Sequence, residues 1–219
     1  GFFTKDGTPA IIYHGQGSGR NYIAYAQDDN MDVWSDPIAI EPKTETGEDA
    51  EMRHWDPDCW LNGDTYFGIS GGGPPHLIKS SDLENWSPLG LLLHEETPDL
   101  GVDVNEDISC ANMFKIGDRW MLLCISHGLG CRYYLGDFQD EFLTPKQRDT
   151  VVRPSDSAQP VPGGVGIKKY LPDFHAMMNW KDWNFFAPES LLTEDGRRVM
   201  WAWCRLENGG TQTAIQSLP

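Results

Sequence analysis

Residues 62–72 read NGDTYFGISGG, and this stretch decides the fold class. A turn around Gly63 leads into a short run of β-branched and aromatic residues, and the run ends at further glycines. Runs of this length and composition, bounded by glycine turns, are typical of β-strands. The same plan recurs at 6–15 (DGTPAIIYHG), 117–128 (GDRWMLLCISHG) and 195–204 (DGRRVMWAWC). The sequence therefore predicts repeated β-hairpins.

The spacing of these turns indicates how the repeats are organised. The turn glycines Gly7, Gly63, Gly117 and Gly196 are 56, 54 and 79 residues apart. A unit of roughly 50 residues is the length of a β-propeller blade. The longer last interval predicts an inserted loop within 144–184, where proline, glycine and serine are frequent.

A second repeat has the same phase. Residues 28–34 (DDNMDVW) and 81–86 (SDLENW) both form an acidic turn that ends on tryptophan, and Trp34 and Trp86 are 52 residues apart. We expect each indole to pack between blades, where the third strand ends or the fourth begins. Long amphipathic helical stripes are absent from the sequence. The expected fold is all-β, a single β-propeller domain over 1–219, incomplete at the N-terminus.

Composition limits the partners. The net charge is −16, so the chain would repel nucleic acid and anionic membrane surfaces. A neutral sugar is not disfavoured. No apolar stretch approaches the length of a membrane span. The five cysteines form no CxxC pair, so neither a metal site nor a cofactor is predicted, and the redox compartment and oligomeric state stay open.

The innermost strand of each blade lines the central channel and directly precedes the hairpin turn. Asp56 and Cys110 each lie seven residues before a turn glycine, so acidic groups are expected near the channel mouth on successive blades. Carboxyl groups that converge there would raise one another's pKa, which can separate a pair into the acid and the nucleophile of glycoside cleavage. The corresponding position before Gly7 precedes residue 1, so the first innermost strand is expected to be missing from this sequence.

Five segments resemble one family in order and spacing. They are 6–15, 53–60 (RHWDPDCW), 78–86 (IKSSDLENW), 106–123 (EDISCANMFKIGDRWMLL) and 184–204 (NFFAPESLLTEDGRRVMWAWC). Together with the closing Ser-Leu-Pro, they resemble glycoside hydrolase family 32, which contains invertases, inulinases and levanases. The resemblance covers nearly the whole chain and implies a five-bladed β-propeller. It implies three acting carboxylates: a nucleophile on the first blade, a transition-state stabiliser in an Arg-Asp-Pro segment and a general-acid glutamate before Cys-Pro-Asp.

Only part of this set is present. The stabilising aspartate corresponds to Asp56, followed by Pro57. Trp55 replaces the family arginine, although Arg53 lies two residues earlier. Asp56 could also simply cap a turn. The family's nucleophile segment has no counterpart in this sequence.

The general acid departs from the family. Its position holds Ser109, which cannot protonate a leaving group. The nearest replacements are Asp107 and Glu106, of which Asp107 is preferred because side chains two apart share a strand face. Both could instead belong to a solvated acidic loop.

The remaining site candidates are substrate contacts. Trp55 either stacks on a sugar face or fills the space of the missing arginine, and Asn112 replaces a family aspartate and could bind a sugar hydroxyl. Glu189 could face substrate or bond to backbone of the next blade. Arg53 and His54 complete the set, with a structural role as the alternative for His54.

The resemblance implies a retaining hydrolase that cleaves fructofuranosyl bonds in sucrose or fructans. Two alternatives remain: a carbohydrate-binding or degenerate propeller without catalysis, suggested by Ser109, Ala111 and Asn112, and an arabinanase-like pentofuranosidase.

Overall fold

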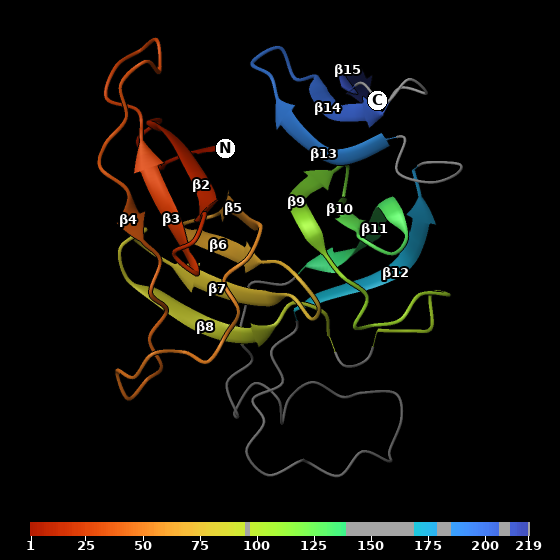
Figure 1. Ribbon diagram of the computed structural model, residues 1–219, viewed down its shortest axis with the longest axis horizontal. Coiled ribbons are helices and arrows are strands. Elements are labelled where there is room, and N and C mark those ends of the chain that lie inside the picture. Colours follow the sequence, from red (N-terminus) through yellow and green to blue (C-terminus); the bar gives the residue numbers. More distant parts are fainter. Residues whose placement is uncertain (95–96, 139–168, 179–184, 206–210, 219) are drawn as a thin grey trace.

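The computed structural model describes residues 1–94, 97–138, 169–178, 185–205 and 211–218. All regular elements in these ranges are β-strands, arranged in four antiparallel sheets (Figure 1). The prediction of an all-β fold is confirmed. The described residues contain no helix that could cross a membrane.

The first two sheets follow the repeat that the turn glycines predict, since Gly7 and Gly63 each join the first strand of a sheet to the second. Their strands run in sequence order across each sheet. The first sheet contains β1 (Phe2–Phe3), β2 (Pro9–Gly15), β3 (Arg20–Tyr25) and β4 (Ile38–Ala39). The second contains β5 (Pro57–Asn62), β6 (Thr65–Ser70), β7 (His76–Ser80) and β8 (Trp86–Leu91).

The third and fourth sheets begin in the same way. The third contains β9 (Ser109–Ile116), β10 (Arg119–Ser126), β11 (Gly130–Phe138) and β12 (Tyr170–Met177). The fourth contains β13 (Phe185–Leu192), β14 (Arg198–Arg205) and β15 (Thr211–Leu218). β12 lies inside the range 144–184 in which an inserted loop is expected, and it pairs with β11. The rest of the range, 144–168 and 179–184, lies outside the described residues.

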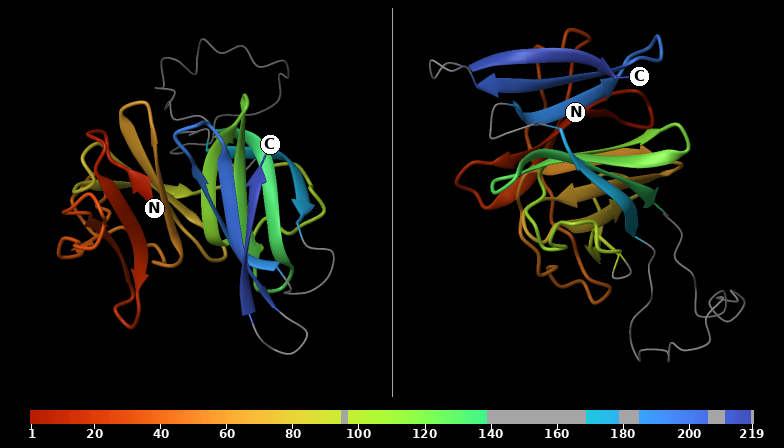
Figure 2. Two further views of the ribbon diagram at one scale, coloured as in Figure 1. Left: turned by 90° about the horizontal axis from the view of Figure 1, so that it is seen from above. Right: turned by 90° about the vertical axis from the view of Figure 1, so that its right-hand side faces the viewer.

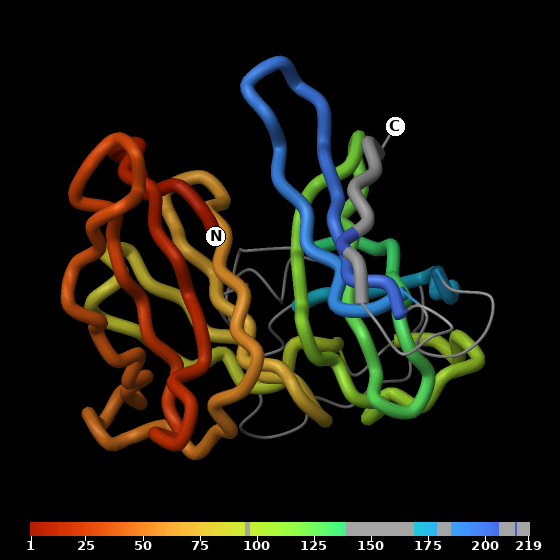
Figure 3. The backbone as a smooth tube through the Cα atoms, turned by 45° about the horizontal axis from the view of Figure 1, so that its top comes forward, coloured from red at the N-terminus to blue at the C-terminus, as the bar shows by residue number. Residues whose placement is uncertain are grey.

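The first strands of successive sheets adjoin one another. β1 contacts β5, β5 contacts β9, and β9 contacts β13. In Figure 1 the sheets follow one another around a common centre, with β5, β9 and β13 nearest to it. In Figure 3 and the left view of Figure 2 the first two sheets lie toward one side of the molecule and the last two toward the other. The expectation that the first innermost strand is missing needs correction, since Phe2 and Phe3 occupy that position in the first sheet.

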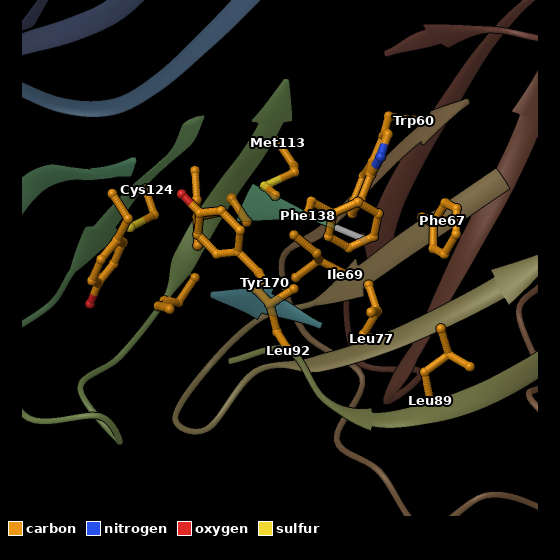
Figure 4. Close-up of a cluster of buried hydrophobic side chains, with 14 residues drawn as sticks. Trp60, Phe67, Ile69, Leu77, Leu89, Leu92, Met113, Cys124, Phe138 and Tyr170 are labelled. Atoms are coloured by element: carbon orange, nitrogen blue, oxygen red, sulfur yellow. The ribbon is translucent and has the colours of Figure 1, made fainter. Parts of the chain in front are cut away.

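Apolar side chains fill the spaces between neighbouring sheets. Between the second and third sheets, Trp60, Phe67, Trp120 and Phe138 pack with ring centroids 5.0–6.2 Å apart. Figure 4 shows the buried cluster that surrounds Tyr170 there. Aromatic pairs at these distances add favourable contact energy beyond the area they bury. This core fixes β5 and β9 relative to each other.

The acidic-turn repeat is also present. Trp86 opens β8 and is 3% exposed, in a core shared with Ile23 and Ile40 of the first sheet region. Its indole N–H donates to the Leu83 carbonyl at 3.0 Å, and the Trp34 indole donates to Met31 at 2.9 Å. The expected packing between sheets is confirmed for Trp86, whereas Trp34 is only half-buried.

Candidate active site

The inner strands share a backbone irregularity at one end. Asp56, Cys110 and Ala187 have φ values of 27°, 46° and 48°, in the left-handed region that non-glycine residues rarely adopt. Asp56 directly precedes β5, and the other two lie near the starts of β9 and β13. Pairing shifts register beside Cys110 and across Ala187. Such strained positions and bulges re-aim side chains and are common beside active sites, so we call this end of the inner strands the mouth.

Cys110 lies among the acidic groups at the mouth. Its backbone N–H donates to Asp56 Oδ2 at 3.3 Å, and its Sγ is 3.9 Å from the same oxygen. Burial, followed by the negative charges of Asp56, Glu189 and Asp107, raises the pKa of the Cys110 thiol to about 12. The negative charges of carboxyl groups from the second, third and fourth sheet regions therefore all act on this thiol.

The glycines at 71–73 bring two of these segments together. A Cβ on Gly71 would lie 2.6 Å from the Ile108 carbonyl oxygen and 3.0 Å from that of Asp56, and one on Gly73 would lie 2.8 Å from the Asn105 carbonyl oxygen. Gly72 and Ile108 exchange backbone hydrogen bonds of 2.8 and 3.1 Å. Only glycine allows so close an approach. The β6–β7 hairpin thus holds the Asp56 and Asp107 segments side by side.

Asp107 is bound through both carboxylate oxygens. Ser109 Oγ donates to Oδ1 at 2.8 Å, while the His127 backbone N–H donates to Oδ2 at 3.1 Å. The His127 ring nitrogen Nδ1 also bonds to Oδ2. Burial alone would raise the pKa of Asp107, but the hydrogen bonds from His127 and Ser109 outweigh it and lower the pKa. Asp107 precedes β9, and its carboxylate lies beside the Ser109 hydroxyl.

Glu106 faces a different group. The hydroxyl of Ser126, the last residue of β10, donates to its Oε1. Arg132, which is wholly buried in β11, donates to the Asp107 carbonyl and to the Tyr134 hydroxyl. The 106–107 segment is therefore fixed to the third sheet through side chain and backbone alike.

Arg53 and Trp55 form a stacked pair beside Asp56. The Arg53 guanidinium lies 4.8 Å from the centroid of the Trp55 ring, and His14 approaches Trp55 at 5.1 Å. Buried Ser70 holds this segment, donating to the Arg53 carbonyl at 2.6 Å and accepting from the Trp55 N–H at 2.9 Å. A cation over an indole leaves less of that face for a sugar.

Two further candidates lie away from this group. His54 is half-buried, and its charged neighbours are Arg20, His14 and Glu41 of the first sheet region; burial, then Arg20 and His14, lower its pKa. The Asn112 carbonyl oxygen accepts from the Ser190 N–H at 3.1 Å and from its hydroxyl at 2.6 Å. Asn112 is 9% exposed, so it links the third sheet to the fourth.

Glu189 and Asp58 are carboxyl groups with raised pKa values. Burial, followed by the charges of Asp58 and Asp56, raises the pKa of Glu189 to about 8. Burial raises the pKa of Asp58 to about 6, although its Oδ2 accepts the Met113 N–H at 2.6 Å. Neither Asp58 nor His127 was chosen as a site residue from the sequence. Asp58 lies two residues after Asp56 on the same strand face, which was the available signal.

An open hollow lies elsewhere. It measures about 470 Å³ and is lined by residues of the first two sheets, including Lys5, Tyr66 and Asp82, but by none of the predicted site residues. Within the described residues, no three His, Cys, Asp or Glu side chains gather as metal ligands.

Comparison with solved structures identifies the architecture. The structure of sucrose-6-phosphate hydrolase from Lactobacillus gasseri superposes with a TM-score of 0.66 at 16% identity, covering 99% of this chain and 45% of that one. Fructan 1-exohydrolase IIa from Cichorium intybus superposes with a TM-score of 0.60 at 16% identity, covering 100% and 45%. These likenesses confirm the β-propeller fold, of which the described residues form four sheets.

Sequence comparison identifies the family. Sucrose-6-phosphate hydrolase from Salmonella typhimurium is 24% identical over 164 residues, 70% of this chain, and that from Escherichia coli is 23% identical over 163 residues. The matches span 31% and 29% of the length of these relatives. The model of the glycosyl hydrolases family 32 N-terminal domain matches residues 1–216. The chain therefore belongs to glycosyl hydrolase family 32.

Proposed function

We propose that the protein hydrolyses fructofuranosyl bonds in sucrose, its phosphate ester or fructans, with retention of configuration. The observation that carries this proposal is the placement of Asp56. Asp56 lies at the mouth, and its backbone is in the left-handed region. Its carboxylate accepts a hydrogen bond from the Cys110 N–H. The β6–β7 hairpin joins it to the Asp107 segment. The relatives described as sucrose-6-phosphate hydrolase and fructan 1-exohydrolase support the substrate class.

In this reaction Asp56 stabilises the positive charge that develops on the sugar ring. Glycoside cleavage passes through an oxocarbenium-like transition state, and a fixed carboxylate favours that state over the neutral substrate. The Cys110 N–H donates to Asp56 Oδ2 and holds this carboxylate in one orientation. The 106–107 segment supplies the acid and base function beside it.

The nucleophile is a separate requirement. A retaining hydrolase needs a second carboxylate that attacks the anomeric carbon. The resemblance places it on the innermost strand of the first sheet, where β1 contains Phe2 and Phe3. We therefore assign no nucleophile within the described residues and propose assays with the full-length protein.

The test is fructose release by the full-length protein from sucrose, sucrose 6-phosphate, inulin and levan, with arabinan as the comparison substrate. Fructose from at least one of the first four supports the proposal. Arabinose release alone would show a pentofuranosidase. Absence of turnover on all five would remove the hydrolase assignment.

One observation favours a second candidate, a sugar-binding propeller without catalysis: Ser109 replaces the general acid, and its hydroxyl is bonded to Asp107. This candidate predicts measurable binding of a fructan with no turnover in the full-length protein. Calorimetric titration run beside the activity assay separates the two.

A further inference from the structure

The residues around Ser109 raise the question of which group delivers the proton to the leaving oxygen. A serine hydroxyl does not ionise in the neutral range, so Ser109 cannot act as an acid there. Its hydroxyl instead donates to Asp107 Oδ1 at 2.8 Å. Ser109 thus fixes a neighbouring carboxylate.

Asp107 is itself a poor proton donor in this environment. Its two oxygens accept hydrogen bonds from Ser109, the His127 backbone and the His127 ring, and its own carbonyl accepts from buried Arg132. Hydrogen bonds of this kind favour the charged carboxylate. An ionised carboxylate has no proton to donate, so the donor must be another group. The side chain that Asp107 binds is His127.

His127 is held in one orientation by that carboxylate. Because an ionised carboxylate only accepts, the Nδ1 of His127 must carry the hydrogen, and Nε2 is the nitrogen that gains and loses a proton. The His127 side chain is 55% exposed, against 25% for Asp107. Histidine is the side chain whose ordinary titration suits proton transfer near neutral pH.

The position of His127 also suits this role. It follows β10 in the turn to β11, and Ile125 of β10 pairs with Ser109 at the start of β9. The turn therefore lies at the mouth end of the third sheet. The His127 ring meets Phe186 of β13 edge to face, with centroids 6.4 Å apart, so it stands between the third and fourth sheets.

We propose that His127 is the acid/base catalyst of this chain, with Asp107 as its positioning residue and Ser109 as the support of Asp107. This inference rests on the proposed function and refines its acid and base step. The pair replaces the single glutamate that the family resemblance implies at Ser109.

The proton balance is simple. In the first half-reaction the bond between the anomeric carbon and the leaving oxygen breaks, its electron pair stays on oxygen, and the Nε2 proton moves to that oxygen. The anomeric carbon forms a bond to the nucleophilic carboxylate. In the second half, water attacks that carbon, the carboxylate leaves, and Nε2 takes one water proton, which restores the starting state.

The test is leaving-group dependence in the full-length protein. His127→Gln should lower kcat/KM for sucrose by about 100-fold or more, the contribution expected of general acid catalysis. An aryl fructofuranoside with an acidic phenol needs little protonation, so its first half-reaction should be nearly unchanged. Azide, which needs no base, should then restore turnover and yield fructosyl azide.

The matched variants separate chemistry from structure. Leu129→Gln changes an exposed side chain of the same turn and should behave as the wild type. Asp107→Asn should reproduce the leaving-group dependence in weaker form, because the imidazole loses its charged partner. Thermal unfolding should show that all three variants are folded.

Two results would overturn the inference. In the first, the wild type releases fructose and His127→Gln cleaves both sucrose and the aryl substrate as fast as the wild type does. His127 is then not the acid, while the proposed function stands. Loss of both activities without an azide product would indicate a structural role. If the wild type itself cleaves no fructofuranoside, the proposed function and this inference both fail.

Discussion

Asp56 is the residue on which the proposed chemistry depends most directly. It occupies the left-handed region, which aspartate and asparagine tolerate better than other non-glycine residues. Asp56→Asn therefore keeps the backbone, the volume and the oxygen that accepts the Cys110 N–H, and removes only the charge. In the full-length protein we expect kcat to fall about 10²–10³-fold, as when one electrostatic contact to a transition state is lost.

The measurement is fructose release, together with the unfolding temperature. The unfolding temperature should change by only a few degrees. Asp32→Asn, at an exposed loop aspartate, is the control and should leave both quantities unchanged. Retained turnover in Asp56→Asn would show that the stabilising charge lies elsewhere.

Asp58 predicts a pH dependence of stability. Burial raises its folded pKa to about 6 from the ordinary value of 3.8, so the folded protein binds this proton more tightly than the unfolded chain does. Stability from this group is full below about pH 4 and falls as the pH rises to 6, by about 3 kcal/mol in total. Asp58→Asn keeps an acceptor for the Met113 N–H and removes the charge.

Urea unfolding at pH 4, 5, 6 and 7 checks this expectation. The decline from pH 4 to 6 should be smaller in Asp58→Asn than in the wild type, and the variant should be the more stable at pH 7. Equal pH profiles for the two proteins would show that Asp58 is not desolvated in solution.

At this scale the sequence could predict residues within one strand but not contacts between hairpins. The sequence indicates Asp56 as a site candidate because it lies seven residues before Gly63. It places Asp107 near Ser109 because the two are two residues apart. His127 is 20 residues from Asp107 and pairs with it only because β10 folds back on β9. Spacing along the chain carries no signal for such a contact.

Among the elements, the two acidic turns are the clearest internal comparison. Asp82 Oδ1 accepts the N–H groups of Glu84 and Asn85 at 2.9 and 2.8 Å, and Asp28 Oδ1 accepts that of Val33 at 2.8 Å. Both tryptophan indoles donate to the carbonyl three residues earlier. The aspartates bond differently, because Asp82 accepts from the second and third residues after it and Asp28 from the fifth. The elements differ in what they position: Trp86 is 3% exposed, whereas Trp34 is half-buried.

This difference predicts unequal costs. Asp82→Ala should lower the unfolding temperature by about 4 °C, because hydrogen bonds worth roughly 1 kcal/mol each are lost beneath a core tryptophan. Asp28→Ala should cost less. The hydrogen bonds to Asp82 also hold its pKa far below the usual range, so its contribution is present above about pH 4 and is lost on acidification. Thermal scans at pH 7 and pH 3 measure both effects, and an equal loss in the two variants would contradict the comparison.

Elements with a local turn signal were predictable, and those without one were not. The four hairpin turns at Gly7, Gly63, Gly117 and Gly196 all appear where the repeat places them. β12 was hidden inside an expected loop, because its pairing with β11 depends on Tyr134 and His175 meeting across the sheet. When a strand depends on pairing with a partner distant in the sequence, its own residues give only a weak signal for it.

For the whole molecule, one inter-sheet hydrogen bond repeats around the mouth. Asp58, two residues after Asp56, accepts the N–H of Met113 in the next sheet. Asn112, two residues after Cys110, accepts the N–H of Ser190 in the sheet that follows. Glu189, two residues after Ala187, occupies the same place in the fourth sheet. The repeat suggests that these polar side chains fasten one inner strand to the next.

Asn112 tests this view against the expectation that it binds a sugar hydroxyl. Asn112→Leu would leave the Ser190 N–H without its acceptor in a buried position, at a cost of about 1–3 kcal/mol. We therefore expect a clear loss of stability in urea and an unchanged KM for sucrose in the folded full-length protein. Asn112→Asp keeps the acceptor for the Ser190 N–H but loses the side-chain hydrogen bond to Asp58 and places a second acid beside it, so this variant should also lose stability at neutral pH. A raised KM with unaltered stability in Asn112→Leu would instead indicate that Asn112 contacts the substrate. The repeated hydrogen bond would then not be what holds one inner strand to the next.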